Sequence, residues 1–280
     1  MKQQPDNPSA DRVGHSTNLV GVGTAFLAST AYNDAPVPLE IAGSRSMNAS
    51  LFEMLDDSPT LDDAAEAFHK YMAAVFGLEP DQREVARRRR EEGGVRRLRS
   101  SYLRLLRSWG WDSNGPEGAV LKGWVESRFG LFPTFHKAPV DSFSGTAWAG
   151  YVEEKMSSRF HNNAIHAQLD ILYAFCQWAL IRREGPPPCH LTLYRGVNDF
   201  TEHPVRERLG KGDLVIRLNS LSSFTADREV ADCFGDTILT ARVPLPKVVF
   251  FTDLLPGNPL KAESEFLVIG GDYRVKAEIL

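Results

Sequence analysis

The sequence predicts an α+β fold, with a helical N-terminal half followed by a region of strands. Apolar residues in the first half recur at helical spacing, and the longest such region, residues 151–184, stops at Gly185 and three prolines. Beyond this stop the apolar residues gather in short runs of strand length. Helices that precede the strands, instead of alternating with them, are typical of an α+β protein. We therefore expect a mostly helical region over residues 1–140 and a second region over 141–280.

Three amphipathic segments account for the predicted helices of the first half. They cover residues 51–55, 64–76 and 98–109. Asp62 and Asp63 fall in the first turn of the second segment, where a carboxylate interacts favourably with the helix dipole. In the long helical region that follows, four residues at helical spacing are expected to face the core: Ile165, Leu169, Leu172 and Cys176.

The second half is predicted to hold a set of short strands. One run ends in Arg195 and Gly196, and another ends in Ser223 and Thr225 before a short helix over 226–234. The expected strands cover residues 191–197, 214–218, 221–225, 237–243, 248–252, 266–269 and 273–279.

Composition argues against several classes of protein. The chain has 280 residues and a net charge of −4, and no stretch approaches the roughly 18 apolar residues that a membrane span needs. The N-terminus lacks the apolar run of a secretory signal. The cysteines Cys176, Cys189 and Cys233 are odd in number and lack Cys-x-x-Cys spacing, which argues against disulfides or a zinc site. His161 and His166 show no metal-ligand spacing either, so we expect a cytoplasmic protein without a metal.

An arginine-rich stretch departs from the otherwise even distribution of charge. Ten arginines and three glutamates lie between Arg83 and Arg107, which gives a local balance of +7. The four arginines at 87–90 belong to a segment without an apolar face. The stretch is either a solvated segment or a docking surface for an acidic partner protein. Nucleic acid is disfavoured, because no aromatic residues interleave the basic run.

Two carboxylates, Glu263 and Glu265, open an apolar run near the end of the chain. Residues i and i+2 of a strand project from the same face, so the two side chains are expected to lie together. The nearest cation in the sequence is Lys261. Because like charges on one face repel, the pattern indicates either a solvated strand end or an acidic pair kept for its chemistry.

Three short motifs follow one another in the second half: Arg195, then Ser223-Phe224-Thr225, then Glu263-Ser264-Glu265. Their order resembles the Arg, Ser-Thr-Ser and Glu-x-Glu motif set of the arginine-specific mono-ADP-ribosyltransferases, with Phe224 in the middle of the second motif. Taken alone, Arg195 could be a surface residue, and Ser223 and Thr225 could cap the following helix. Phe224 and Phe234 are expected to be core residues rather than residues that stack on nicotinamide.

The resemblance implies that NAD is the co-substrate and that each motif residue has a role. Breaking the N-glycosidic bond of NAD develops positive charge on the ribose, and Glu265 would stabilise that charge through a hydrogen bond. Glu263 would orient and partly deprotonate the acceptor guanidinium, which is otherwise cationic and inert. The planar fork of Arg195 suits the pyrophosphate. The Ser223 hydroxyl would hold the catalytic carboxylate, and Thr225 would also line the NAD site.

Longer stretches resemble the dinitrogenase reductase ADP-ribosyltransferase family of nitrogen-fixing bacteria. They cover residues 14–21, 101–106, 113–133 and 153–164, whereas residues 83–97 match least. The resemblance implies a mixed β-sandwich ADP-ribosyltransferase core in the second half. It also implies transfer of ADP-ribose from NAD to one arginine of the nitrogenase iron protein, which reversibly inactivates nitrogen fixation. A PII-type nitrogen signalling protein is the implied regulator, and neither nucleic acid nor a membrane is an expected partner.

Two other functions remain open from the residues alone. One is a mono-ADP-ribosyltransferase or NAD glycohydrolase with a different acceptor, and the other is a non-catalytic module that binds NAD or a signal. Glu265 argues against the non-catalytic module, and Glu263 argues against a pure glycohydrolase, which has no nucleophile to orient. The loop at 252–262, before the acidic pair, is either a plain connection or, by resemblance, the turn that reads the acceptor.

Overall fold

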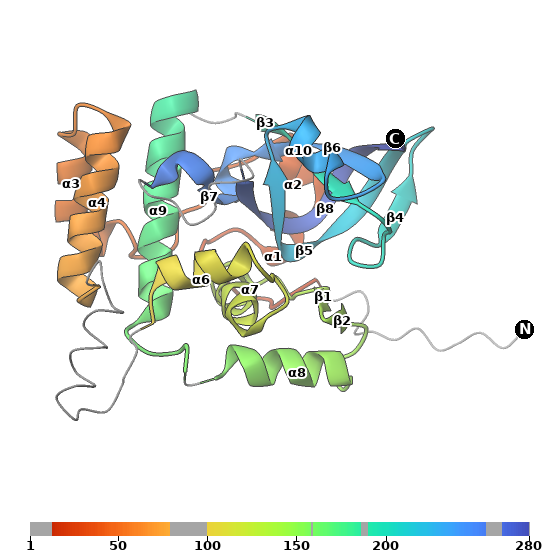
Figure 1. Cartoon of the computed structure of the whole chain (residues 1–280), viewed down its shortest axis with the longest axis horizontal. Coiled ribbons are helices and arrows are strands. Elements are labelled where there is room, and N and C mark those ends of the chain that lie inside the picture. Colours follow the sequence, from red (N-terminus) through yellow and green to blue (C-terminus); the bar gives the residue numbers. More distant parts are fainter. Residues whose placement is uncertain (1–12, 79–99, 158, 186–189, 256–264, 280) are drawn as a thin grey trace, which may run out of the picture.

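The computed structural model describes residues 13–78, 100–157, 159–185, 190–255 and 265–279. Figure 1 shows a group of helices beside and below one twisted sheet. The predicted α+β class is confirmed, because the strands follow most of the helices and pair with one another. Glu263, Cys189 and the arginines at 83–97 lie outside the described residues. What the sequence indicates about them therefore stays a prediction, as does the division into two regions at residue 140.

The helices of the described ranges include several of the predicted ones. They are α1 (Thr24–Leu27), α2 (Thr30–Asp34), η1 (Ser46–Asn48), α3 (Ala49–Asp56), α4 (Leu61–Phe76), α6 (Tyr102–Trp109), α7 (Pro116–Phe129), α8 (Thr146–Lys155), α9 (Ile165–Glu184) and α10 (Arg228–Asp232). Side-chain caps begin four of them, α2, α4, α6 and α10, and two of these caps serve as examples. The Thr60 hydroxyl accepts from the Asp63 N–H at the start of α4, and the Ser101 hydroxyl accepts from the Arg104 N–H at the start of α6.

The long helical region predicted over residues 151–184 is interrupted. Helix α8 ends at Lys155 and α9 begins at Ile165, directly after Ala164, whose φ is +49°. No glycine or proline marks this break in the sequence, so local signals do not reveal it. The predicted core stripe of α9 is confirmed, since all four of its residues are buried. Helix α7 corresponds to no predicted element.

The described strands form one antiparallel sheet and a short hairpin of β1 (Phe135–His136) and β2 (Ala138–Pro139). The sheet strands are β3 (His190–Val197), β4 (Val205–Arg208), β5 (Asp213–Thr225), β6 (Thr237–Pro244), β7 (Val248–Phe251) and β8 (Glu265–Ile279). Their order is β4-β5-β3-β6-β8-β7, with a further pairing between β5 and β8. Strands β3, β6, β8 and β5 therefore pair in a closed ring. All these pairs are antiparallel, which corrects the expectation of a mixed sheet for the described strands.

Two of the sheet strands are longer than predicted. Strand β8 joins the runs at 266–269 and 273–279, and β5 joins those at 214–218 and 221–225. The pairing between β5 and β8 shifts register between Leu218 and Leu221. At this shift the two backbones approach closely, because a Cβ atom at Gly270 would lie 1.8 Å from the Asn219 carbonyl oxygen. Only glycine fits at position 270. Gly270 and Gly271, which lie between the two predicted runs, therefore belong to one bent strand.

Helix α9 lies between the sheet and the α3–α4 pair (Figure 1). One of its faces packs on β7 and another on α4 and α6. Phe175 of α9 stacks on Phe68 of α4 at a ring distance of 4.3 Å, and Tyr102 of α6 meets the same Phe68 edge-on. The buried apolar side chains of helices and sheet form one contiguous cluster. This core places the C-terminal end of α6 against strand β5.

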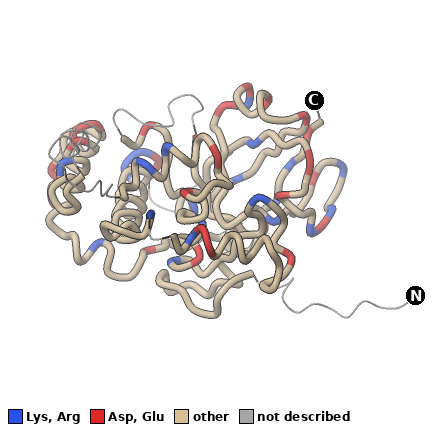
Figure 2. Tube along the Cα trace, turned by 60° about the horizontal axis from the view of Figure 1, so that its bottom comes forward, with Lys and Arg blue, Asp and Glu red and all other residues tan. Residues whose placement is uncertain are grey.

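Charge is mixed along the described part of the chain, where Figure 2 shows basic and acidic residues interspersed. Several pairs join distant segments, such as Arg128 with Asp170 at 2.8 Å and Arg217 with Asp272 at 2.7 Å. None of the helices in the described ranges combines the length and the apolar character that a membrane crossing requires.

Candidate active site

A pocket of about 220 Å³ lies where β3, β5, α10 and the start of β8 meet. Four of the five predicted site residues line it: Arg195, Ser223, Thr225 and Glu265. The fifth, Glu263, lies outside the described residues. The other lining residues are Tyr194, Gly196, Phe224, Val230, Ala231 and Phe234.

Strand register brings these distant residues together. Thr225, the last residue of β5, pairs with Glu265, the first residue of β8, and also with Tyr194 on β3. Arg195 follows Tyr194 directly, and Ser223 lies two positions before Thr225. Antiparallel pairing therefore gathers the described motif residues Arg195, Ser223, Thr225 and Glu265 at one end of the sheet, although they are far apart in the chain.

Glu265 is held by a short relay of hydrogen bonds. The Ser223 hydroxyl donates to Glu265 Oε1, and the indole N–H of Trp109 donates to Ser223 Oγ over 2.8 Å. Because the indole N–H can only donate, it leaves the serine proton for the carboxylate. Glu265 and Trp109 are both buried, at 4% and 3% exposure. The arrangement restrains the carboxylate at one side of the pocket.

The backbone of Glu265 is also fixed. Its N–H donates to Thr252 Oγ1 over 2.7 Å, and the Thr252 hydroxyl donates to the Glu265 carbonyl oxygen. Thr252 opens the short 3₁₀ helix η3 (Thr252–Leu254), which follows β7. The reciprocal pair ties the first residue of β8 to the end of β7, so Glu265 stands at a defined strand start.

Arg195 is oriented by two contacts and one nearby acid. Its Nε–H donates to His203 Nε2 over 2.9 Å, and Nη1 donates to the Ser223 carbonyl oxygen over 2.8 Å. Nη2 lies 3.5 Å from Glu202 Oε2. Burial lowers the pKa of Arg195, and the neighbouring Glu202 and Glu265 oppose this shift. The guanidinium stays charged at neutral pH, because an arginine pKa begins far above that range.

His203 serves Arg195 as a neutral acceptor. An arginine cannot accept a hydrogen bond, so His203 Nε2 must be unprotonated and the ring proton must sit on Nδ1. The side chain is 1% exposed, and burial, together with the adjacent Arg195 charge, lowers its pKa to about 3. The contact is therefore intact over the whole range near neutral pH.

The segment after Thr225 is built differently from the helix cap that the sequence suggested. The N-cap of α10 is Asp227, whose carboxylate accepts from the Glu229 N–H over 2.9 Å. Thr225 Oγ1 instead accepts from the N–H of Asp227, the N-cap residue itself, and the Ser223 hydroxyl bonds to Glu265. The cap interpretation of Ser223 and Thr225 is therefore wrong.

Gly196, which follows Arg195, is required for steric reasons. A Cβ atom at Gly196 would lie 2.0 Å from the Ala231 carbonyl oxygen. Helix α10 can therefore rest directly on β3, which places Val230 and Ala231 in the pocket wall. A larger residue at this position would push α10 away from the site.

Of the two phenylalanines expected in the core, only one lies there. Phe224 is 2% exposed, as predicted. Phe234 is 51% exposed and lines the pocket, so its assignment to the core is wrong. It follows the C-terminal end of α10, where the backbone of Phe234 and Gly235 lies against β3 while the Phe234 ring is left half exposed. An exposed ring at the pocket wall is available for a flat ligand.

A second hydrogen-bond network, formed by Lys122 and Asn114, positions Glu202. The buried Lys122 of α7 donates to Asn114 Oδ1 over 2.8 Å and to the Phe135 carbonyl oxygen over 3.1 Å. Asn114 in turn donates to Glu202 Oε1 over 3.4 Å. Burial lowers the pKa of Lys122 to about 8. Neither this network nor Trp109 and His203 was identified from the sequence, because each contact joins segments whose proximity no local pattern reveals.

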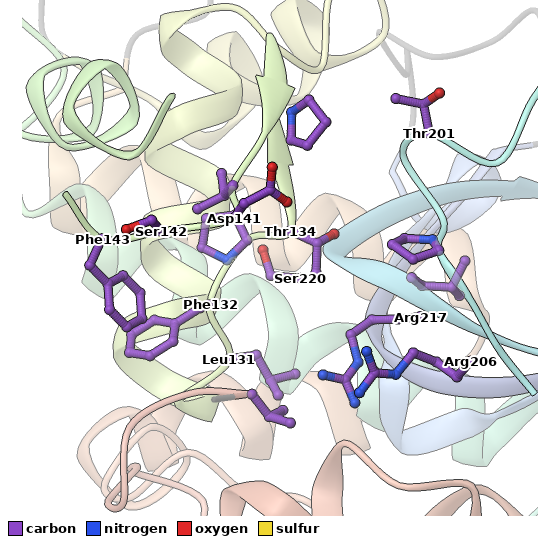
Figure 3. Close-up of a pocket in the computed structure, with 17 residues that line it drawn as sticks. Leu131, Phe132, Thr134, Asp141, Ser142, Phe143, Thr201, Arg206, Arg217 and Ser220 are labelled. Carbon is purple, nitrogen blue, oxygen red and sulfur yellow. The ribbon is translucent and has the colours of Figure 1, made fainter. Parts of the chain in front are cut away.

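A second cavity of about 270 Å³, shown in Figure 3, contains none of the predicted site residues. In that view the guanidinium groups of Arg206 and Arg217 lie side by side. Thr201 and Pro204 line this cavity, while Glu202 and His203 between them turn towards Arg195. The chemistry that the motifs predict is therefore confined to the first pocket.

No group of three or more His, Cys, Asp or Glu side chains within the described ranges is placed to bind a metal ion. His161 and His166 meet as rings 5.2 Å apart, and burial lowers the pKa of His166 to about 4. The residues that gather in the pocket instead suit an anionic, ribose-bearing substrate.

A buried carboxylate that suits a cationic ribose, in one pocket with an arginine that suits a pyrophosphate, is the arrangement expected of a class of enzyme, the ADP-ribosyltransferases that consume NAD. Comparison with known proteins agrees. The family model for dinitrogenase reductase ADP-ribosyltransferase matches residues 17–277, and the chain belongs to this family. It is 60% identical over 268 residues to the NAD(+)--dinitrogen-reductase ADP-D-ribosyltransferase of Rhodospirillum rubrum, and the match covers 96% of each chain. No solved structure matches.

Proposed function

We propose that this enzyme transfers ADP-ribose from NAD to an arginine of the nitrogenase iron protein, dinitrogenase reductase, and so reversibly inactivates nitrogen fixation. Membership of the family supports the reaction and the acceptor. The observation that carries the proposal is the position of Glu265, a buried carboxylate held by Ser223 in a pocket that also contains Arg195.

Glu265 supplies the main electrostatic contribution in this proposal. The bond between ribose C1′ and the nicotinamide nitrogen breaks, and its electron pair leaves with nicotinamide. The ribose becomes cationic as this happens, and a fixed carboxylate stabilises that state more than the ground state. The relay from Trp109 through Ser223 keeps the carboxylate in place, so no reorganisation is needed during the reaction.

Arg195 and Phe234 are proposed to bind NAD. The Nη1 and Nη2 groups of Arg195 would donate to the pyrophosphate, while His203 and the Ser223 carbonyl hold the guanidinium plane. The exposed ring of Phe234 would pack on the nicotinamide ring from the α10 side. Thr225 lines the same pocket and would contact the nicotinamide ribose.

Glu263 is proposed to act on the acceptor. A guanidinium is a poor nucleophile until it begins to lose a proton. By family resemblance, Glu263 accepts that proton while the acceptor nitrogen forms its bond to C1′. This assigns bond cleavage to Glu265 and acceptor activation to Glu263, and it makes the enzyme specific for arginine.

Three further features of the proposal rest on family resemblance and composition. A PII-type nitrogen signalling protein would regulate the enzyme. The enzyme would act in the cytoplasm, where its cysteines stay reduced. Residues 141–280 would form the ADP-ribosyltransferase core, with sandwich-like packing of the sheet.

One experiment tests the proposed function directly. The full-length protein is incubated with NAD labelled in the adenylate part and with purified dinitrogenase reductase, and the modified residue is mapped by mass spectrometry. Label on a single arginine of dinitrogenase reductase is the expected result. Release of free ADP-ribose without protein labelling would show an NAD glycohydrolase, and neither reaction would show a non-catalytic module; both contradict the proposal.

A further inference from the structure

The most exposed aromatic side chain of the described residues lies two residues after Trp109, which bonds to Ser223, and takes no part in the chemistry above. Trp111 is 88% exposed, whereas most large apolar side chains of the structure are buried. Contact of a large indole ring with water is unfavourable. Tryptophan is also among the residue types most enriched in the energetic anchors of protein interfaces. Its position therefore needs an explanation.

Trp111 belongs to the α6–α7 loop, residues 110–115, which joins two helices that contact residues around the pocket. At one end of the loop, Trp109 bonds to Ser223, and near the other end, Asn114 bonds to Glu202. Trp111 is two residues beyond Trp109, so its backbone lies within about 8 Å of that buried anchor. The loop is thus bracketed by contacts to two residues that hold the catalytic groups.

Hydrogen bonds also restrain the backbone of the loop. The Trp111 N–H donates to the Ser108 carbonyl oxygen over 3.1 Å, and the Asn114 N–H donates to Asp112 Oδ1 over 2.9 Å. Lys122 fixes Asn114 from the buried side. A large side chain on a preorganised loop loses little conformational entropy when a partner covers it.

The partner follows from the reaction. An arginine side chain has a limited reach. A protein whose arginine enters the pocket and reaches Glu265 must therefore place its own surface against the rim of the pocket. A small acceptor places no such demand. The surface around the pocket is therefore expected to contact protein, and the α6–α7 loop, which is tied to Ser223 through Trp109 and to Glu202 through Asn114, is the candidate for that contact.

We propose that Trp111 docks the acceptor protein, with its indole seated in an apolar depression of dinitrogenase reductase next to the arginine that is modified. The inference rests on the proposed function and deepens it, because it assigns a residue to recognition of the protein rather than of NAD. Trp111 has no role in bond cleavage. Its contribution is confined to holding the acceptor surface against the loop.

The test compares two acceptors for the full-length enzyme, purified dinitrogenase reductase and the small guanidino compound agmatine. For Trp111→Ala we expect kcat/KM with dinitrogenase reductase to fall by about tenfold or more, mainly through KM, as for an interface anchor. Transfer to agmatine should keep its wild-type rate. Trp111→Phe, which keeps an aromatic ring, should have a kcat/KM with dinitrogenase reductase between those of the wild type and Trp111→Ala.

Met47→Ala is the matched control. Met47 is 85% exposed and lies in η1 ahead of α3, which Figure 1 places on the far side of α9 from the sheet. This variant should match the wild type with both acceptors. The inference is overturned if Trp111→Ala modifies dinitrogenase reductase at the wild-type rate, or if it loses transfer to agmatine equally. A wild-type enzyme that modifies agmatine but not dinitrogenase reductase would overturn the proposed function and, with it, docking of this acceptor.

Discussion

The indole N–H of Trp109 donates a 2.8 Å hydrogen bond to Ser223 Oγ, and the same hydroxyl donates to Glu265. Trp109 ends helix α6, and Ser223 lies near the end of strand β5. Helix α6 thus reaches Glu265, the proposed catalytic carboxylate, through the Ser223 hydroxyl. Because a serine hydroxyl has one proton, the indole decides where that proton points.

The first prediction concerns the indole N–H of Trp109, which phenylalanine lacks while keeping an aromatic ring. In Trp109→Phe, the Ser223 hydroxyl loses its fixed donor and can turn away from Glu265. We expect kcat for NAD-dependent transfer to fall by about tenfold, the equivalent of one hydrogen bond of about 1.4 kcal/mol, with the KM for NAD unchanged. Steady-state kinetics with agmatine as acceptor measures both constants.

Trp178→Phe is the control for this variant. It also removes an indole hydrogen bond, from Trp178 to Asp56 Oδ1 at 2.7 Å, but on α9 and away from the pocket. It should lower stability and leave kcat unchanged. Equal kcat values for Trp109→Phe and wild type would mean that the indole does not position the carboxylate.

The second prediction concerns Arg195. Its Nε–H and Nη1 are engaged by His203 and by the Ser223 carbonyl oxygen, so the planar group is held from two directions. Lysine keeps the charge but cannot make both contacts and also face a pyrophosphate. Arg195→Lys should weaken NAD binding by about 1–3 kcal/mol in calorimetry. Arg208→Lys, on the exposed strand β4, should bind NAD normally; an unchanged dissociation constant for Arg195→Lys would show a purely structural arginine.

The third prediction concerns the pH dependence of stability. The pKa of His203 falls to about 3 in the folded state, below its ordinary value of 6.5. At a pH above 6.5 the ring is neutral in both states, and as the pH falls towards 3 only the unfolded chain gains the proton. The stabilising contribution is therefore complete above pH 6.5 and is lost progressively on acidification.

His203→Gln isolates this contribution. Glutamine can accept the Arg195 hydrogen bond but cannot be protonated. Between about pH 7.5 and pH 5.0 the wild type should lose about 2 kcal/mol more unfolding free energy than the variant. Urea denaturation at a series of pH values measures the difference, and the other histidines cancel because both proteins carry them. Parallel pH profiles would show that His203 titrates normally in the folded enzyme.

The fourth prediction separates the two acids of the Glu-x-Glu motif. Glu263→Gln should abolish modification of arginine but leave slow hydrolysis of NAD, since cleavage needs Glu265 and only the acceptor needs Glu263. Nicotinamide release and protein labelling are followed in the same reaction. Glu207→Gln, an exposed acid on β4, serves as the control. Loss of both activities together would rule out the division of labour.

The elements of the active site could be predicted because the information is local. The strand ends that carry Arg195, Ser223 and Thr225 show as apolar runs closed by polar residues, and β3 begins and ends within one residue of its predicted bounds. The side-chain alternation that would place Glu263 and Glu265 on one face stays a prediction, because Glu263 lies outside the described residues. Antiparallel register then completed the pocket, without any demand on the sequence beyond strand formation.

The supporting residues could not be predicted, because their roles depend on contacts between distant segments. Trp109 fits the apolar stripe of α6, and nothing in that spacing indicates a bond to a serine 114 positions later. His203 lies in an irregular loop, where no periodicity applies. Phe234 was misassigned because an aromatic residue after a short helix usually packs inward, whereas α10 has only five residues and ends before it.

The proposed transfer of ADP-ribose to dinitrogenase reductase depends most directly on the carboxylate of Glu265. Glu265→Gln is nearly isosteric and can still accept from Ser223, so the fold and NAD binding should persist. The decisive measurement is the single-turnover rate of ADP-ribose transfer to dinitrogenase reductase, with NAD affinity determined in parallel by calorimetry. We expect unchanged NAD affinity and a rate lower by at least about 10³-fold, because the charge acts on the cationic ribose. A near-normal rate for Glu265→Gln would contradict this expectation.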